Sequence, residues 1–167
     1  ADLLEQILAP ANIRRAFKKV KANRGAAGVD GMTVDEFAGW ARQNWPKICS
    51  TWMDGTYRPQ PVLRVEIPKT TGKDMRKLGI PTVLDRVICQ AIAQVLSERL
   101  DPEFSKSSFG YRPGCSAHGA LRQMQTSLRR GYRIAVDIDV KAFFDYVNHD
   151  VIFARPSRHI RDKRVLR

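Results

Sequence analysis

The sequence lacks the patterns that mark several common classes of protein. Its three cysteines, Cys49, Cys89 and Cys115, are far apart and form no CxxC pair, which argues against a disulfide framework. Cys115 and His118 form a single CxxH without a second half, a weak signal for zinc. The chain has no long apolar run, signal peptide, lipidation motif or internal repeat, so we expect no membrane anchor and no solenoid.

Acidic residues are also scarce relative to basic ones. The 29 lysines and arginines exceed the 17 aspartates and glutamates, which gives a formal charge of +12. A solvated basic face or a contact with anionic lipid would fit this charge, but without a membrane motif it favours a nucleic-acid partner. The 167 residues fit one domain, or one and a fragment of another, and 43% hydrophobic residues can form a sizeable core.

The N-terminal third is predicted to be helical around a glycine-rich loop. Residues 2–21 form one or two amphipathic helices, and Asn23–Met32 is expected to be a mobile loop. Thr33 and Glu36 predict a capping box before two helices over 34–43 and 46–54. Their aromatic residues are interpreted first as core, and less favourably as a base-stacking platform. The polar side of residues 2–21 carries Arg14, Arg15, Lys18, Lys19 and Lys21.

The middle of the chain predicts a β-hairpin and two further helices. Residues 62–67 alternate in polarity, and Leu78–Pro81 is extended, so the two arms form a hairpin. The strongest helix runs from Thr82 to about Leu100, and Ser116 can cap another over 117–130. The mixture is α+β. Four basic residues at the hairpin tip could converge on a triphosphate or a nucleic-acid backbone, or form a solvated loop: Lys69, Lys73, Arg76 and Lys77.

Tyr132–Asp150 is the segment that contains the candidate metal-binding carboxylates. The alternation over 134–140 predicts a half-buried strand with Asp137 and Asp139 on one face. Two-metal phosphoryl transfer uses carboxylates that bridge two divalent ions, and Asp139 could be one of them. By pattern alone, a structural aspartate at a strand end is an equally good interpretation.

Three sequence blocks together resemble the reverse transcriptases that bacterial group II introns encode. The blocks are IPK…RKLGIPTVLDRV, SSFGYRPGCSAHGAL and VDIDVKAFFDYVNHD, and they occur in the order of that family. The N-terminal ANRGAAGVDGM is also similar to the family's N-terminal extension. The resemblance covers nearly the whole chain.

This resemblance implies an incomplete right-hand polymerase fold and a cytoplasmic, bacterial protein. Residues 1–55 would be the N-terminal extension of the fingers, with a template loop over 23–32. Residues 56–115 would be the fingers with the basic hairpin, and 116–167 the start of the palm. The implied activity is that of an RNA-directed DNA polymerase and maturase, with Mg²⁺ as cofactor and an RNA template (intron RNA), a DNA primer and dNTP as partners.

The resemblance also assigns roles to individual residues. Asp139 matches a catalytic, metal-binding aspartate, and the carbonyl of Val140 would be a further metal ligand. Phe144 matches the aromatic residue under the incoming sugar. The triphosphate would be bound by Lys69 and Arg76, and nucleic acid by Asn23, Arg24, Gly25 and Arg112.

The chain departs from the family pattern after the first catalytic block. It contains no Asp-Asp pair of the YADD type and no PQG block, so one of three expected carboxylate ligands is present. We therefore expect a fragment, or a decayed reading frame, that binds RNA without catalysis unless a C-terminal half is supplied. Pro156 falls in a predicted helix and should kink or end it.

Overall fold

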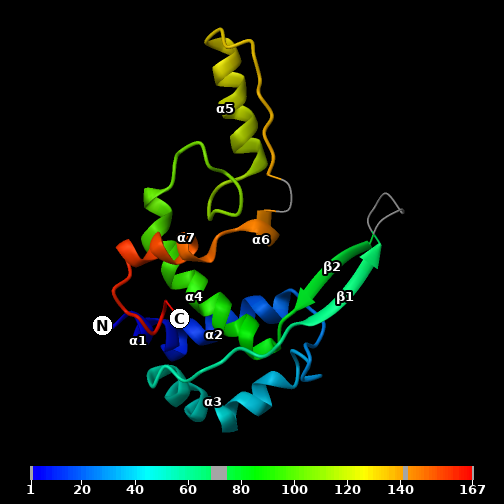
Figure 1. Ribbon diagram of the computed structural model, residues 1–167, viewed down its shortest axis with the longest axis vertical. Coiled ribbons are helices and arrows are strands. Elements are labelled where there is room, and N and C mark those ends of the chain that lie inside the picture. The colour runs from blue at the N-terminus through cyan, green and yellow to red at the C-terminus, as the bar shows by residue number, and fades with distance from the viewer. Residues whose placement is uncertain (1, 69–74, 141–142, 167) are drawn as a thin grey trace. The chain divides into compact units, whose positions relative to one another are not determined.

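The described residues form helices and one two-stranded sheet (Figure 1), which is the α+β mixture predicted from the sequence. The computed structural model describes residues 2–68, 75–140 and 143–166, without the side chains of Phe144 and Asp145. The chain divides into two compact units. The first comprises Ala1–Leu96 and Pro156–Arg167, and the second comprises Ser97–Arg155.

The first unit begins with two short helices, α1 (Leu3–Leu8) and α2 (Pro10–Ala22). A single residue, Ala9, separates them, and Pro10 occupies the first turn of α2. Proline is well placed there because its missing N–H would have had no partner within the helix. Of the one or two helices predicted over residues 2–21, the structure therefore forms two.

A single helix, α3 (Phe37–Met53), replaces the two helices predicted over 34–43 and 46–54. The expected capping box forms, with the Thr33 N–H 2.8 Å from Glu36 Oε2, but residues 34–36 are a turn before the helix. Pro46 lies inside α3 without ending it. Aromatic packing stabilises α3 on both sides of Pro46. At the N-terminal end Phe37 contacts Phe17, with ring centroids 5.2 Å apart, and at the C-terminal end Trp52 stacks on Tyr57 at 5.0 Å.

The predicted hairpin is present as β1 (Leu63–Pro68) and β2 (Met75–Ile80), which pair antiparallel. The register aligns Leu63 with Ile80 and Ile67 with Arg76. Side chains alternate between the two faces of the hairpin. One face therefore carries the apolar residues of both strands, and Arg76 lies on this same face, opposite Ile67. Residues 69–74, which include the predicted tip lysines Lys69 and Lys73, lie outside the described residues.

The predicted central helix is α4 (Val83–Leu100), and its first 14 residues form one wall of the core of the first unit. Buried side chains from α1, α2, α3 and α4 meet there, together with Ile160 from the C-terminal segment. Inside this core, the Asn12 side chain donates to the carbonyls of Ile7 and Ala91 at 2.8 and 3.0 Å. Buried polar groups cost free energy unless they are hydrogen-bonded, so these bonds fix how the helices pack.

The second unit carries one long helix, α5 (Ala117–Arg129), which Ser116 caps as predicted by accepting a hydrogen bond from the Gly119 N–H at 3.2 Å. Shorter helices are η1 (Asp101–Glu103), α6 (Phe143–Tyr146) and α7 (His149–Ala154). Helix α7 ends before Pro156, where the 3₁₀ helix η2 (Pro156–Arg158) follows. The predicted early stop is confirmed.

The strand predicted over 134–140 is not formed. This segment has no regular secondary structure and pairs with none of the described residues. Ile134, Val136 and Ile138 are 88%, 77% and 83% exposed. Alternation in the sequence specifies which side chains share a face, but a strand also needs a neighbour for its N–H and C=O groups.

Candidate nucleic-acid interface

The glycine-rich loop predicted to lie over a template packs against the start of α4. Asn23 ends α2, with its N–H 3.2 Å from the Lys19 carbonyl, and Arg24 has a positive φ of 47°. The Arg86 guanidinium then donates to the carbonyl of Ala26 at 2.7 Å. The loop predicted from the glycines is therefore present, and the Arg86 hydrogen bond attaches it to a helix.

Two glycines make this close approach sterically feasible. A Cβ on Gly28 would lie 2.7 Å from Thr82 Cα and 2.8 Å from Thr82 N, both backbone atoms. A Cβ on Gly25 would overlap the Arg86 guanidinium. Gly31 instead has open space around it and a φ of +70°, so its role is conformational.

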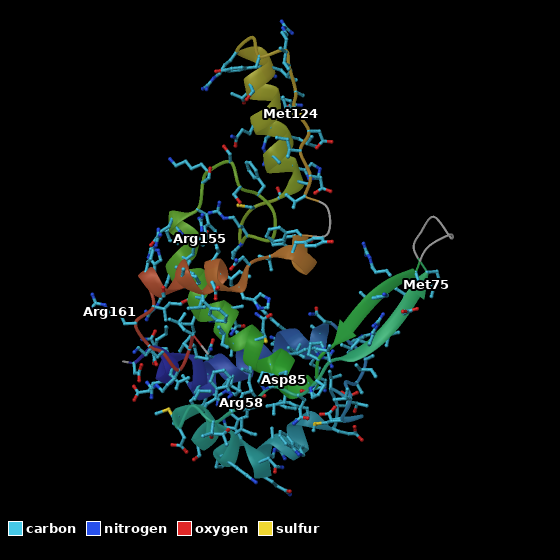
Figure 2. The ribbon with its side chains drawn as sticks, in the orientation of Figure 1. Arg58, Met75, Asp85, Met124, Arg155 and Arg161 are labelled. Carbon is cyan, nitrogen blue, oxygen red and sulfur yellow. The ribbon has the colours of Figure 1, made fainter. Side chains whose placement is uncertain are left out.

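The carboxylate of Asp85, which is labelled in Figure 2, is buried near the start of α4 and joins this helix to the segment before the hairpin. Sequence reasoning missed it. It is 5% exposed and accepts hydrogen bonds from the Tyr57 hydroxyl at 2.6 Å, the Thr82 hydroxyl at 2.6 Å and the Gln60 N–H at 3.2 Å. Burial, followed by the Asp85 hydrogen bond, raises the pKa of Tyr57 well above its ordinary value. The sequence did contain a signal for the Thr82–Asp85 contact, because the Thr-x-x-Asp spacing at the start of α4 is a capping-box pattern.

Helix α2 presents the basic surface that the sequence predicted. Arg14, Arg15, Lys18 and Lys19 are exposed. Lys21 forms an ion pair with Asp35 at 2.9 Å, so part of its charge is balanced locally. Exposed ammonium and guanidinium groups at helical spacing can contact successive phosphates of a nucleic acid.

Arg112 is engaged within its own loop. Its guanidinium donates to both Asp101 carboxylate oxygens, at 2.8 and 3.2 Å, and to the Asp101 carbonyl at 2.9 Å. It also donates to the carbonyls of Ser105 and Ser108 at 2.7 and 2.9 Å. A guanidinium has five N–H donors, and all five are accounted for. The Asp101 hydrogen bond also raises the pKa of Arg112.

The predicted metal ligands lie in the irregular segment before α6. Asp139 is exposed, and its Oδ1 accepts a hydrogen bond from the Val140 N–H at 2.9 Å. In the part of the chain that the structure describes, no three His, Cys, Asp or Glu residues gather as a metal site. Phe144 belongs to α6, but its side chain lies outside the described residues.

The predicted site residues are divided between the two units. Asn23, Arg24, Gly25 and Arg76 belong to the first unit, where the loop and the hairpin both adjoin the start of α4. The second unit contains Arg112, Asp139, Val140 and Phe144. Lys69 lies outside the described residues. Over the described ranges, no helix is long and apolar enough to cross a membrane.

Comparison with known proteins supports the interpretation of the three blocks. A model of the family described as reverse transcriptase (RNA-dependent DNA polymerase) matches residues 67–163. The group II intron-encoded protein LtrA of Lactococcus lactis subsp. cremoris is 34% identical over 98% of this chain. Protein YkfC of Escherichia coli K12 is 30% identical, also over 98%. The chain spans 27% of LtrA and 44% of YkfC.

Proposed function

This chain belongs to the reverse transcriptase family, and we propose that it supplies the fingers and the first catalytic block of a group II intron-type RNA-directed DNA polymerase. The observation that carries the proposal is the family match over residues 67–163, which contains all three sequence blocks. The similarity to LtrA extends it to the N-terminal loop and helices. In a complete enzyme the reaction would transfer a deoxynucleotidyl group to a primer 3′-hydroxyl.

In this proposal the first unit binds the template and the incoming nucleotide. The loop from Asn23 through Arg24 and Gly25 lies along the template, and its attachment to α4 supports a fixed position. Arg76 and Lys69 bind the triphosphate from the hairpin. Arg76 is exposed at the end of the apolar hairpin face, where its guanidinium is accessible to a phosphate.

The second unit would contribute the metal-binding end of the site. The Asp139 carboxylate and the Val140 carbonyl are oxygen ligands, the type that Mg²⁺ prefers, and the exposed carboxylate is free to turn outward. Bound Mg²⁺ would activate the primer hydroxyl and stabilise the leaving phosphate. Phe144 would lie under the nucleotide sugar. For Arg112 we propose an indirect role, in which it shapes the loop that faces the template.

For these 167 residues alone, we propose RNA binding without polymerisation. The exposed cations of α2 and the formal charge of +12 favour this behaviour, and the sequence has no second aspartate block. Contacts with about five phosphates would give a slope of roughly −4 for log K against log salt concentration.

Two measurements on the purified chain test the proposal. In a filter-binding titration with a structured RNA, affinity should fall steeply as salt rises, and Arg14→Gln with Lys18→Gln should flatten the slope by about 2. The matched control is Arg42→Gln with Lys47→Gln on α3. No affinity at low salt would refute RNA binding. Primer extension on poly(rA)/oligo(dT) with Mg²⁺ should be absent. Robust incorporation that Asp139→Ala abolishes would refute the account of the missing ligands.

A further inference from the structure

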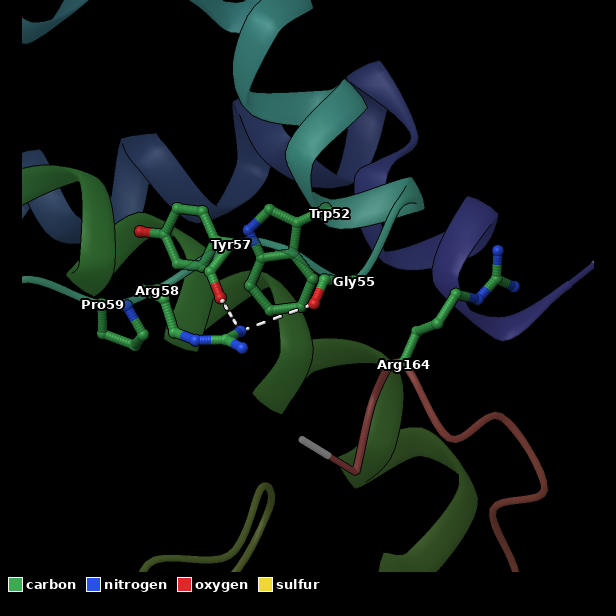
Figure 3. A pocket seen from close by; sticks show the side chains of 6 residues that line it. All are labelled: Trp52, Gly55, Tyr57, Arg58, Pro59 and Arg164. Carbon is green, nitrogen blue, oxygen red and sulfur yellow. Dashed lines mark hydrogen bonds between the residues drawn. The ribbon is translucent and has the colours of Figure 1, made fainter.

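A pocket of about 430 Å³ lies beside the C-terminal end of α3 (Figure 3), and none of its residues belongs to the predicted polymerase site. The volume is in the range of small-molecule sites. All of the lining residues belong to the first unit. They are Trp52, Gly55, Tyr57, Arg58, Pro59 and Arg164.

One wall of the pocket is a preformed aromatic surface. Trp52 and Tyr57 stack with their ring centroids 5.0 Å apart and an interplanar angle of 29°. The Tyr57 hydroxyl is held by the buried Asp85 at 2.6 Å, so this ring is fixed at both its face and its tip. Both side chains are half-buried, which leaves part of the aromatic surface accessible. Rigid aromatic surfaces of this kind stack on nucleobases.

The cation of the pocket is Arg58. Its Nη1 donates to the carbonyls of Tyr57 and Gly55 at 2.9 and 3.4 Å, and Figure 3 shows the guanidinium lying beside the two rings. Within the described ranges, its Nε and Nη2 have no hydrogen-bond acceptor. Arg164 differs, because it bonds to the carboxylates of Asp162 and Asp2 and its charge is balanced. Arg58 can therefore accept an anion at a fixed position.

We propose that this pocket binds one nucleotide, with the base against Trp52 and Tyr57 and the phosphate on Arg58. An aromatic surface beside a half-satisfied guanidinium matches a planar heterocycle that carries a phosphate. The ligand is either a free nucleotide or an unpaired nucleotide of an RNA. The pocket shares no residue with the proposed polymerase site, and the proposal does not depend on Asp139.

The first experiment titrates the chain with AMP, adenosine and ribose 5-phosphate, to about 10 mM, and follows tryptophan fluorescence and heat of binding. AMP should bind and quench, and each half-ligand should bind at least about tenfold more weakly. Arg58→Gln should lose about tenfold in AMP affinity, whereas the exposed-arginine control Arg42→Gln should not. Trp52→Phe retains a ring but should abolish most of the quenching, because Trp40 and Trp45 are not in the pocket. Circular dichroism verifies that each variant is folded.

The second experiment identifies the source of the nucleotide. An RNA hairpin with one bulged adenosine is compared with a fully paired hairpin of equal length. If RNA is the source, the bulged hairpin binds about tenfold more tightly, and Arg58→Gln removes the difference. If AMP binds but the hairpins are equivalent, the source is a free nucleotide. The proposal is overturned if AMP fails to bind and the hairpins are equivalent, or if Arg58→Gln leaves AMP affinity unchanged. If the parent chain fails to bind even the paired hairpin, this result counts against RNA binding by α2 in the proposed function and does not count against the pocket.

Discussion

Replacement of Gly28 by alanine should detach the glycine-rich loop from α4. The added methyl group would lie 2.7 Å from Thr82 Cα, 2.8 Å from Thr82 N and 3.0 Å from the Pro81 carbonyl carbon. All three are backbone atoms at the start of a helix whose first residues are buried, so none can rotate away. The loop must therefore move, and the hydrogen bond between Arg86 and the Ala26 carbonyl is the first contact to break.

The expected cost follows from two opposing effects. Inserting a methylene-sized group into a packed contact costs about 1–3 kcal/mol. Replacing glycine by alanine also restricts the unfolded chain and returns about 0.4–1 kcal/mol where the backbone allows it. We expect Gly28→Ala to lower the free energy of unfolding by about 1–2 kcal/mol. The matched control is Gly39→Ala in α3, where a Cβ meets nothing within 4 Å and should be neutral or stabilising by up to about 1 kcal/mol.

Urea unfolding and amide hydrogen exchange measure the two parts of this prediction. In Gly28→Ala, exchange should accelerate across the loop from Asn23 to Gly31, and trypsin should cleave faster after Arg24. Gly39→Ala should change neither property. If Gly28→Ala were as stable as the parent chain and its loop exchanged at the same rate, the loop would not be docked on Thr82 in solution.

Three further predictions concern charged groups with defined partners. Asp85→Asn should lower the free energy of unfolding by about 1–3 kcal/mol in urea, because it weakens the acceptor of the Tyr57 hydroxyl; an unchanged midpoint would contradict this. Arg112→Lys should accelerate amide exchange across 104–115, since an ammonium cannot serve five separate acceptors; unchanged exchange would show that the loop does not need the guanidinium. The Arg164 hydrogen bond lowers the pKa of folded Asp162 below its ordinary value of 3.8. The ion pair therefore stabilises the fold fully above that pH, and its effect is lost only as the pH falls through the lowered pKa. Thermal unfolding across a pH series should show Asp162→Asn less stable than the parent at pH 6, by a small amount because the pair is partly solvated, and this difference should shrink progressively as the pH falls from about 4 towards 2.

Local patterns predicted those elements whose partners are near in the sequence. Alternation and flanking prolines located the hairpin, and a continuous apolar stripe located α4. Ser116 was identified correctly as the N-cap of α5, because a cap depends only on the next three residues. Thr33 and Glu36 form the expected reciprocal hydrogen bonds, but Thr33 is not the N-cap, since α3 begins at Phe37 with Glu36 in that position. The two helices predicted over 34–43 and 46–54 are a single helix, because the local cost of Pro46 inside α3 is outweighed by packing against distant aromatic residues.

The candidate site was less predictable because its side chains depend on distant partners. Nothing in the sequence around Arg112 reveals that Asp101 and two carbonyls take all of its donors. Asp85 looked like an ordinary helix residue, although it receives hydrogen bonds from residues 25 and 28 positions earlier. The strand predicted around Asp139 required a pairing partner, and alternation does not supply one. The metal-ligand and nucleotide roles of Asp139, Arg76 and Phe144 stay predictions.

The return of the C-terminal segment to α1 has a consequence for how the protein is made. Ile160 is 3% exposed in the core that also contains Leu3 and Ile7, so the first unit is completed by a residue more than 150 positions away from its first helix. Closing so large a loop raises contact order and slows folding. During synthesis, the ribosome must release the whole second unit before this core can close. Until then the apolar side chains that Ile160 covers in the finished core stay without this partner.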